Sequence, residues 1–230
     1  MERENNRMEL KFSKANMIFI TGIGTGVGKT IVSAIVTEAL KADYWKPIQA
    51  GFEDGTDSSE IKSFITNERS IIHPEVYKFK MPASPHIAAR MEGIKIDLDN
   101  IVAQMPIINP SSNLIIEGAG GIMVPLNDDE FVIDLIDKLQ AKVILVSRNY
   151  LGSINHSLLT ASICKQRNID VIGWIFNDQY LDYEEEIVKW SGYPKIASIP
   201  YVSTINKEFI LEQALVVKKY FDLENNHKLK

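Results

Sequence analysis

Short runs of apolar, largely β-branched residues alternate along the chain with segments in which apolar residues recur at helical spacing. In one helical segment Val32, Ile35, Val36 and Ala39 share a face. Buried strands that alternate with amphipathic helices are typical of βαβ units, in which helices cover both faces of a mainly parallel sheet. The pattern therefore predicts an α/β fold, with strands at 17–21, 43–47, 113–117, 142–147, 170–177 and 195–200.

Further helices are indicated by the same spacing. Residues 132–139 and 210–221 each carry an apolar face, and a short helix is expected from about Asp97. The alternation is interrupted at 66–90, where three prolines occur without a sustained apolar run. We expect a long excursion from the sheet there.

The chain shows no internal repeat, low-complexity tract or linker. Its 230 residues suffice for one full core but would be cramped as two domains. We therefore expect a single α/β domain at 17–222, preceded by an N-terminal extension at 1–16 and followed by a C-terminal tail at 223–230.

Composition narrows the function classes. The net charge of -5 disfavours non-specific nucleic-acid binding, which needs a basic surface. A single cysteine, Cys164, cannot form an internal disulfide or a thiolate metal site. Use of so few cysteines is typical of the reducing cytoplasm, where we expect this protein. No apolar run approaches the length of a membrane span, so with the acidic charge we expect neither a membrane nor a nucleic-acid partner.

The most informative stretch is TGIGTGVGKT at 21–30, between an expected strand and an expected helix. Its glycines allow backbone N–H groups to turn inward around an anion, to which the helix also presents its N-terminus. Lys29 is placed to reach phosphate oxygens and Thr30 to bind Mg²⁺. The spacing from Gly22 to Gly28 is one residue longer than the usual phosphate loop (P-loop), and the alternative is a glycine-rich turn with an incidental lysine.

Ligands of open parallel sheets bind beyond the carboxyl ends of the strands, and two charged residues stand there. Glu117 ends an apolar run and could complete a Mg²⁺ site beside Thr30. Lys46 ends the second strand and could neutralise a phosphoryl group or a substrate anion. The alternative for each is an ordinary solvated side chain.

Two helix starts leave structural and functional interpretations open. Asp57 either caps a helix, with Glu60 completing a capping box, or supplies a second carboxylate to Mg²⁺. The segment at 152–156 either caps the next helix or offers free N–H groups to a carboxylate. Catalysis by Cys164 is disfavoured because no base lies near it in the sequence.

Taken together, several motifs resemble the dethiobiotin synthetase family, in the family's order from about 17 to 201. They are Thr25, Val27-Gly28-Lys29-Thr30, Lys46-Pro47-Ile48-Gln49, Ser84-Pro85-His86, Glu117-Gly118-Ala119-Gly120-Gly121, Gly152-Ser153-Ile154-Asn155-His156, Gly173-Trp174 and Asn177-Asp178. The combination is far more specific than any single motif.

The resemblance implies an ATP- and Mg²⁺-dependent ligase of biotin synthesis. Its substrates would be 7,8-diaminononanoate and CO₂, and its products dethiobiotin, ADP and phosphate. One amine captures CO₂ as a carbamate, ATP phosphorylates the carbamate, and the second amine closes the ureido ring. Such chemistry needs positioning and charge neutralisation, and it needs no protein nucleophile.

The resemblance also implies roles for individual residues. The catalytic residues would be Lys46, Lys29 and Thr25. The nucleotide would be bound by Gly26, Val27, Gly28, Lys29, Thr30, Asn177, Pro200 and Tyr201. Mg²⁺ would be held by Thr30, Asp57 and Glu117. In this family the site straddles a homodimer interface, so the substrate would be bound by Lys46 and by the second copy's Gly152, Ser153, Ile154 and Asn155.

Two positions depart from the family pattern. Family members often carry an acidic residue where this chain has Gly26, so a side-chain contact from that position is in doubt. They often carry a hydroxyl residue where this chain has Ala50, and its loss predicts weaker diamine binding with the same reaction.

Three other functions are compatible with a P-loop in an α/β domain, and each predicts a feature of its own. A partitioning-type P-loop ATPase switch would carry a second lysine early in the loop, where this chain has Gly24. A cobyrinate-type amidoligase would need a glutaminase domain, for which the chain is too short. A non-catalytic nucleotide-binding module would bind ATP without turnover when diamine and bicarbonate are supplied.

Overall fold

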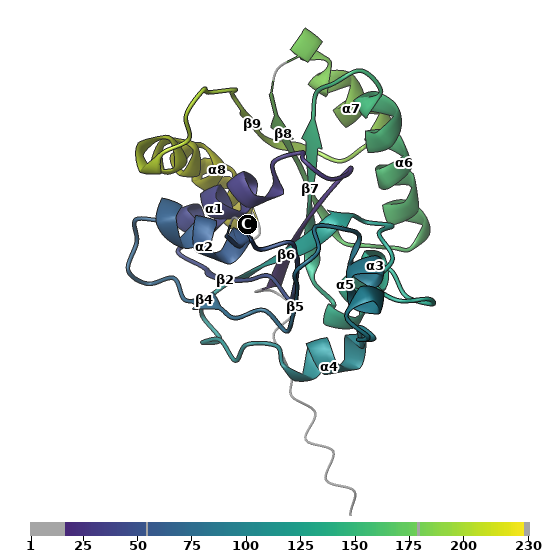
Figure 1. Cartoon of the computed structure of the whole chain (residues 1–230). Helices are drawn as coiled ribbons and strands as arrows, with labels where there is room; N and C mark the ends of the chain where they lie inside the picture. The colour runs from purple at the N-terminus through teal and green to yellow at the C-terminus, as the bar shows by residue number, and fades with distance from the viewer. Residues whose placement is uncertain (1–16, 54, 179, 228–230) are drawn as a thin grey trace, which may run out of the picture.

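The computed structural model describes residues 17–53, 55–178 and 180–227, and seven strands within them form one sheet. The strands are β1 (Met17–Gly22), β2 (Asp43–Trp45), β4 (Ile72–His73), β6 (Leu114–Gly121), β7 (Lys142–Arg148), β8 (Val171–Asn177) and β9 (Lys195–Ile199). Their order is β4-β2-β6-β1-β7-β8-β9, and each neighbouring pair runs parallel (Figure 1). All six expected strands are present, which confirms the predicted α/β fold.

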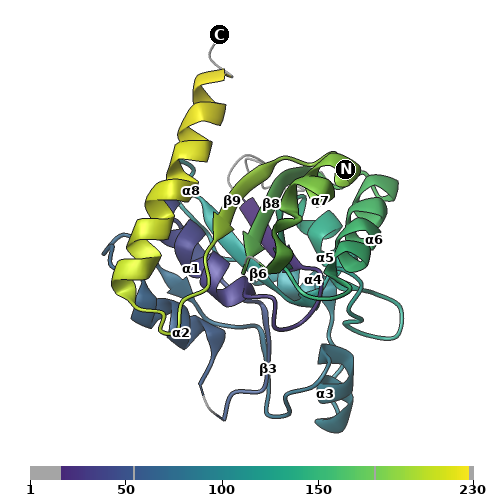
Figure 2. The same cartoon turned by 90° about the horizontal axis from the view of Figure 1, so that it is seen from above.

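Helices cover both faces of this sheet (Figures 1 and 2). One face is packed by α1 (Lys29–Leu40), α2 (Asp57–Phe64) and α8 (Lys207–His227). The other face is packed by α5 (Val132–Leu139), α6 (Ser153–Gln166) and α7 (Glu184–Ser191). α3 (Pro85–Met91) and α4 (Leu98–Ala103) belong to the same hydrophobic cluster, where α4 contacts α5 and α3 contacts strands outside this sheet. A short 3-10 helix, η2 (Tyr180–Asp182), precedes α7.

The two layers arise from the alternation of side chains along each strand. In β1, Ile18 and Ile20 pack into the cluster beneath α1 and α8, whereas Met17 and Phe19 pack into the cluster beneath α5 and α6. A strand buried on both faces must be apolar at every position, and β1 and β7 are apolar almost throughout for this reason. Each fully buried side chain of this size contributes about 1.5–3 kcal/mol.

The order of the strands decides where a ligand can bind. From β1 the chain builds outward on one side through β2 and β4, returns to β6 beside β1, and then continues on the opposite side with β7. The loops that follow β1, β6 and β7 therefore diverge at the carboxyl edge of the sheet. Such a switch point leaves a crevice, which is where ligands of open α/β sheets bind.

The excursion expected at 66–90 contains ordered elements. Its first strand, β4, pairs with β2 at the edge of the sheet. Its second, β5 (Tyr77–Phe79), pairs with β3 (Ile48–Ala50) in a separate two-stranded sheet, and α3 follows it. Strands of two or three residues are too short to show an alternating pattern in the sequence.

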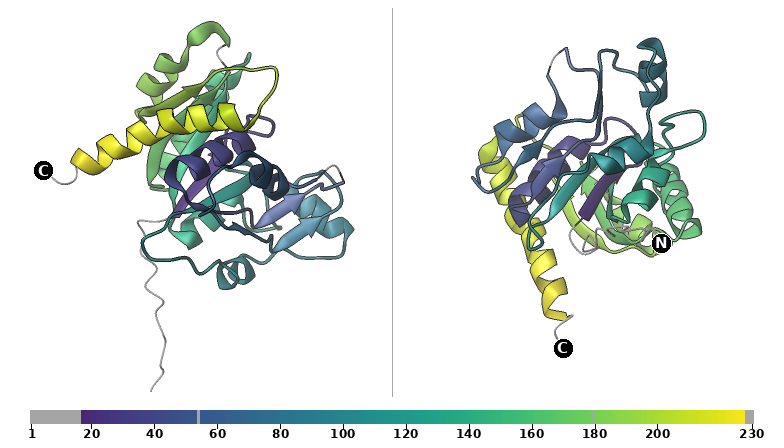
Figure 3. Two further views of the ribbon diagram at one scale, coloured as in Figure 1. Left: turned by 90° about the vertical axis from the view of Figure 1, so that its left-hand side faces the viewer. Right: turned by 90° about the horizontal axis from the view of Figure 1, so that it is seen from below.

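The last helix extends further than expected. α8 runs to His227, so residues 223–227 belong to it and not to the tail assigned to 223–230 (Figure 3). These residues include neither glycine nor proline, and nothing in the sequence ends the helix there. The N-terminal extension at 1–16 and the end of the tail at 228–230 lie outside the described residues. Within the residues described, no helix is both long and apolar enough to cross a bilayer.

Candidate active site

The glycine-rich loop connects β1 to α1, as the sequence predicts. Gly28 caps the N-terminus of α1 with a φ of 88°, and Gly26 has a φ of 72°. A β-carbon on Gly28 would lie 2.4 Å from Nδ2 of Asn177, so only glycine fits where α1 begins. The loop thus presents the free N–H groups of the helix start to the crevice.

Lys29 folds back across this loop. Its Nζ donates a hydrogen bond to the carbonyl oxygen of Gly24 at 2.9 Å. Burial lowers the pKa of Lys29 to about 8, although the carboxylate of Glu117 opposes this shift. A phosphate next to Lys29 would favour the charged form, so the side chain is suited to bind an anion.

A buried lysine and two carboxylates meet next to the loop. Nζ of Lys46 donates to Oε1 of Glu117 at 2.9 Å and also to Oδ2 of Asp57. Thr30 Oγ1 donates to the same Glu117 oxygen at 3.1 Å, and Tyr44 OH donates to its other oxygen at 2.9 Å. Burial of Lys46 favours its neutral form, but Glu117 and then Asp57 outweigh that effect and raise its pKa. The lysine is therefore a fixed positive charge.

Four different elements bring this cluster together. Lys46 follows β2, Glu117 lies in β6, Thr30 is in the first turn of α1 and Asp57 begins α2. β2 and β6 are neighbours in the sheet, as are β6 and β1, so the carboxyl ends that carry these groups converge. Lys46 is only 5% exposed and Glu117 1%, which strengthens their electrostatic interaction.

The helix cap expected at Asp57 is one residue earlier. Thr56 is the N-cap of α2, and its side chain and that of Ser59 form the capping box, so the assignment to Asp57 and Glu60 was wrong. Asp57 is instead the first helical residue, and its N–H donates to Oε1 of Gln49 at 3.3 Å. Because Asp57 does not cap the helix, its carboxylate is available to the cluster.

The cluster forms one wall of a cavity of about 670 Å³, which is within the usual range for small-molecule sites. The cavity extends from the P-loop to the excursion after β3 and β5. Residues from these parts that line it include Thr25, Lys29, Ala50, Pro82, Ser84 and Pro85. Ser84 and Pro85 belong to a motif that the resemblance singled out.

The oxygen atoms near Lys46 suit a hard divalent cation. Among the residues that the structure describes, no three His, Cys, Asp or Glu side chains are grouped as a metal site. Mg²⁺ usually takes one or two carboxylates and completes its shell with phosphate oxygens and water. That donor set is provided by the carboxylates of Glu117 and Asp57 and by the hydroxyl of Thr30. Lys46 bonds to both carboxylates, and Thr30 bonds to Glu117.

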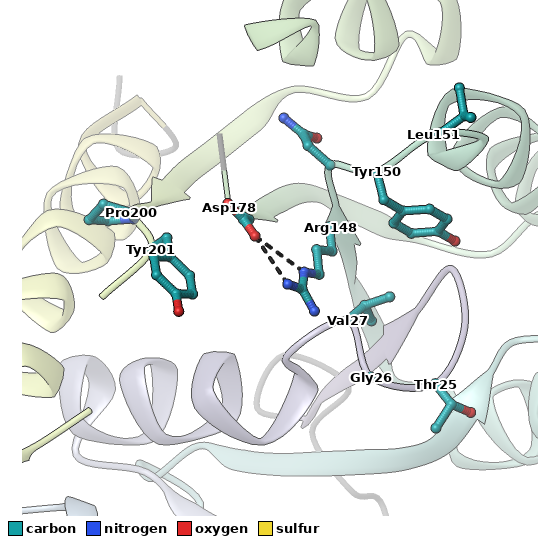
Figure 4. Close-up of a pocket in the computed structure, with 10 residues that line it drawn as sticks. Thr25, Gly26, Val27, Arg148, Tyr150, Leu151, Asp178, Pro200 and Tyr201 are labelled. Atoms are coloured by element: carbon teal, nitrogen blue, oxygen red, sulfur yellow. Dashed lines mark hydrogen bonds and ion pairs between the residues drawn. The ribbon is translucent and has the colours of Figure 1, made fainter. Parts of the chain in front are cut away.

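Six of the eight expected nucleotide residues surround a second cavity, whereas Lys29 and Thr30 line the Lys46 cavity. Nδ2 of Asn177, at the end of β8, donates to the carbonyl oxygen of Val27 at 2.7 Å. Pro200 and Tyr201, after β9, line the cavity together with Gly26 and Val27 (Figure 4). The structure therefore brings the expected phosphate and adenine residues to one edge of the sheet.

The segment at 152–155 lies apart from the lysine cluster of its own chain. Gly152 caps α6, but the described residues that line the Lys46 cavity include none of this segment. The Ser153 hydroxyl is buried and bonds to the hydroxyl of Tyr183 at 2.7 Å, and its N–H donates to the Tyr150 carbonyl. Ser153 thus stabilises the turn, and the helix start can offer a ligand only the N–H groups that follow it.

Several residues at the site were not singled out from the sequence. Tyr44 lies within an apolar strand, where an aromatic residue is normally part of the core. Gln49 belongs to a quoted motif but was given no role. Arg148 ends β7, Asn149 follows that strand, and Asp178, quoted in a motif but given no role, follows β8. The strand-end rule that found Glu117 could have assigned all three to the site.

Cys164 takes no part in the site. Its side chain is buried inside α6, and burial raises the pKa of the thiol to about 12. The thiolate needed for nucleophilic attack is therefore scarce at neutral pH, in agreement with the sequence-based expectation.

Comparison with known sequences identifies the family. The family model described as an AAA domain matches residues 16–208. The ATP-dependent dethiobiotin synthetase BioD of Cytophaga hutchinsonii is 51% identical over 205 residues, covering 89% of this chain and 96% of that protein. The enzyme of the same name from Christiangramia forsetii is 48% identical over 202 residues, covering 88% of this chain and 92% of that protein.

Solved structures share the fold at low sequence identity. The septum site-determining protein MinD of Pyrococcus horikoshii, solved with Mg-ADP, superposes with a TM-score of 0.57 at 15% identity, covering 93% of this chain and 98% of that chain. A ParA family ATPase from Chlorobium tepidum gives a TM-score of 0.53 at 14% identity, covering 90% and 91%. At this level of identity the solved structures show only a P-loop NTPase-like fold. The two dethiobiotin synthetases are about half identical to this chain, and the alignments span nearly their whole length. The chain belongs to the ATP-dependent dethiobiotin synthetase family.

Proposed function

We propose that this chain converts 7,8-diaminononanoate and CO₂ to dethiobiotin at the expense of ATP. The observation that carries the proposal is the buried Lys46, held between Glu117 and Asp57 beside the P-loop residues Lys29 and Thr30. A fixed positive charge next to a phosphate-binding loop is what an anionic carbamate and a phosphoryl group in transfer require.

The reaction proceeds in three steps. One amine of the substrate adds to CO₂ and loses a proton, which gives a carbamate. A carbamate oxygen attacks the γ-phosphorus of ATP, and ADP leaves. The second amine then attacks the carbonyl carbon of the mixed anhydride and loses a proton, phosphate leaves, and the ureido ring is closed.

The residues of the chain contribute charge and position to these steps. Lys46 stabilises the negative charge of the carbamate and of the phosphoryl group, and Lys29 and Thr25 bind the phosphates from the loop. Thr30, Asp57 and Glu117 would hold Mg²⁺, which when bound would supply positive charge against the phosphates. Asn177, Pro200 and Tyr201 bind the adenine.

The second half of the substrate site comes from another copy of the chain. Residues 152–155 do not line the Lys46 cavity of their own chain. Next to them an exposed hollow of about 450 Å³ is lined mostly by apolar side chains, among them Met123 and Leu159. A homodimer that buries this face would bring the α6 N-terminus of one copy toward the lysine cluster of the other.

Complementation tests the shared site. The variants Lys46→Met and Asn155→Asp should each be inactive, the second because it places a negative charge beside the substrate carboxylate. Mixed dimers would contain one site with both residues intact and should regain activity. If each chain carries a complete site, the mixture stays inactive.

The function itself is tested by an omission series. Purified protein is incubated with diaminononanoate, bicarbonate, Mg²⁺ and ATP, and dethiobiotin is detected by mass spectrometry together with released phosphate. Product should form only when all four components are present. ATP hydrolysis without dethiobiotin would contradict the proposal and favour an ATPase switch, and ATP binding without any turnover would favour a nucleotide-binding module.

A further inference from the structure

Two hollows meet at the carboxyl ends of β7, β8 and β9, next to the P-loop. They share Gly26, Val27, Arg148, Asp178, Pro200 and Tyr201 as lining residues. The larger has a volume of about 720 Å³, and the smaller extends beneath it toward Ile31 and Phe209 with about 190 Å³. Together they form a partly apolar space between the loop and the start of α8.

Arg148 projects into this space from the last position of β7. It is the register partner of Asn177 on β8, so the two side chains lie next to each other on the same face of the sheet. Figure 4 shows the guanidinium pointing toward Val27, with the ring of Tyr201 turned into the cavity from the other side. Arg148 therefore faces Tyr201 across the space beside the residue expected to bind adenine.

Asp178 fixes how the guanidinium is presented. Nε and Nη2 of Arg148 both donate to Oδ2 of Asp178, at 3.3 and 3.2 Å. This contact uses one edge of the planar group and restrains its rotation, while the arginine side chain remains 47% exposed. A ligand in the cavity therefore meets the faces or the remaining edge of the guanidinium.

The charge of this pair argues against a phosphate as its ligand. Arg148 is already neutralised by Asp178, and an anion would have to approach the carboxylate as well. A neutral, flat, polarisable group meets no such repulsion and can stack on both a guanidinium and an aromatic ring. Tyr201, 72% exposed on the opposite side, provides that ring.

We propose that Arg148 is a binding residue for the nucleobase of ATP, which stacks between its guanidinium and the ring of Tyr201. This inference rests on the nucleotide dependence of the proposed function and adds a residue to it. Arg148 binds the face of the base, whereas Asn177 lies at its edge. Stacking is tolerant of base identity, so Arg148 contributes to the affinity for every nucleotide and not to discrimination among them.

Calorimetric titration of Arg148→Ala tests the proposal. The ligands are ATP, GTP, CTP and inorganic tripolyphosphate, each with Mg²⁺. We expect the affinity for the three nucleotides to fall roughly tenfold, while tripolyphosphate, which lacks a base, binds as it does to the wild type. Unchanged ATP affinity would overturn the proposal, and so would an equal loss for tripolyphosphate, which would make Arg148 a phosphate ligand.

Three further variants sharpen the test. Arg167→Ala removes another partly exposed arginine–aspartate pair, with Asp134, and should leave the affinities unchanged. Arg148→Lys keeps the positive charge but lacks the planar guanidinium, so it should bind nucleotides as weakly as Arg148→Ala. Wild-type nucleotide affinity in Arg148→Lys would refute the stacking role. If Arg148→Ala does not fold, Tyr201→Ala should give the same selective loss, and its absence would equally overturn the proposal.

The failures of the two proposals are distinguishable. If the wild type forms dethiobiotin and Arg148→Ala binds nucleotides normally, only the role of Arg148 is refuted. If the nucleotide-selective loss is found but no dethiobiotin forms, the base-binding role stands and the proposed reaction is refuted.

Discussion

Replacement of Lys46 by methionine perturbs the site most directly. Met fills a similar volume but removes the ammonium group. In the wild type, Nζ of Lys46 lies 2.9 Å from Oε1 of Glu117, so the variant leaves this buried carboxylate without its cation. At an effective dielectric constant of about 20, charges at that distance attract by about 6 kcal/mol, part of which offsets the cost of burying them. Breaking buried pairs by removing one partner costs about 3–5 kcal/mol, so we expect the free energy of unfolding to fall by about this amount without Mg²⁺.

Magnesium should reduce that loss. Mg²⁺ restores positive charge between Glu117 and Asp57, so it should stabilise Lys46→Met more than it stabilises the wild type. Turnover should fall by about a hundredfold or more, since the charge that stabilises the carbamate is absent.

Urea unfolding with and without Mg²⁺, followed by circular dichroism, measures these effects. Lys62→Met, on the exposed side of α2, is the matched control and should change stability by no more than about 0.5 kcal/mol. A Lys46→Met protein as stable as the control and no more responsive to Mg²⁺ than the wild type would refute the assigned charge balance.

Three other changes test separate parts of the structure. Lys29→Ala should abolish turnover with an unchanged circular dichroism spectrum, because it removes the phosphate-binding charge; a fully active variant would contradict the P-loop assignment. Ala50→Ser should tighten diamine binding roughly fivefold by restoring one hydrogen bond, and an unchanged affinity by calorimetry would argue against that role. Glu38 accepts hydrogen bonds from Thr66 and Asn67; burial opposes its ionisation, but these bonds outweigh burial and lower its pKa below the ordinary 4.5. Its stabilisation is present above that pH and lost as pH falls through the lowered pKa. Glu38→Gln should therefore cost about 1–3 kcal/mol in urea unfolding at pH 7 and progressively less in acid, and a pH-independent cost would contradict this explanation.

The sequence was sufficient to predict the fold because its main signals are local. Strands such as β1 and β7 are buried on both faces and therefore almost entirely apolar, and the helices between them show a helical period. β3, β4 and β5 could not be found in this way, because each is short and lies at the edge of the main sheet or in a separate two-stranded sheet, whereas the equally short β2 is buried between β4 and β6. The end of α8 was misplaced for the opposite reason, since no local signal stops it.

The arrangement of the candidate site could be predicted only in part. The strand-end rule pointed to Glu117 and Lys46. It could not predict that Lys46 binds Asp57 and Glu117 at the same time, because that contact requires four elements to converge. The cap of α2 was misassigned because Thr56 and Asp57 are both good capping residues and differ by one position. Tyr44 could not be assigned to the site from the sequence, because its ring is part of the hydrophobic core and only its hydroxyl contacts Glu117.

The fate of labelled bicarbonate tests the central claim most directly. Wild-type protein and Lys46→Met are incubated with carbon-13 bicarbonate, diaminononanoate, Mg²⁺ and ATP, and dethiobiotin and phosphate are quantified. We expect the wild type to form dethiobiotin that carries the label in its ureido carbon, with one phosphate released per product, and the variant to form almost none. Phosphate release without labelled dethiobiotin, or labelled product from both proteins at equal rates, would contradict the assignment of the reaction to this site.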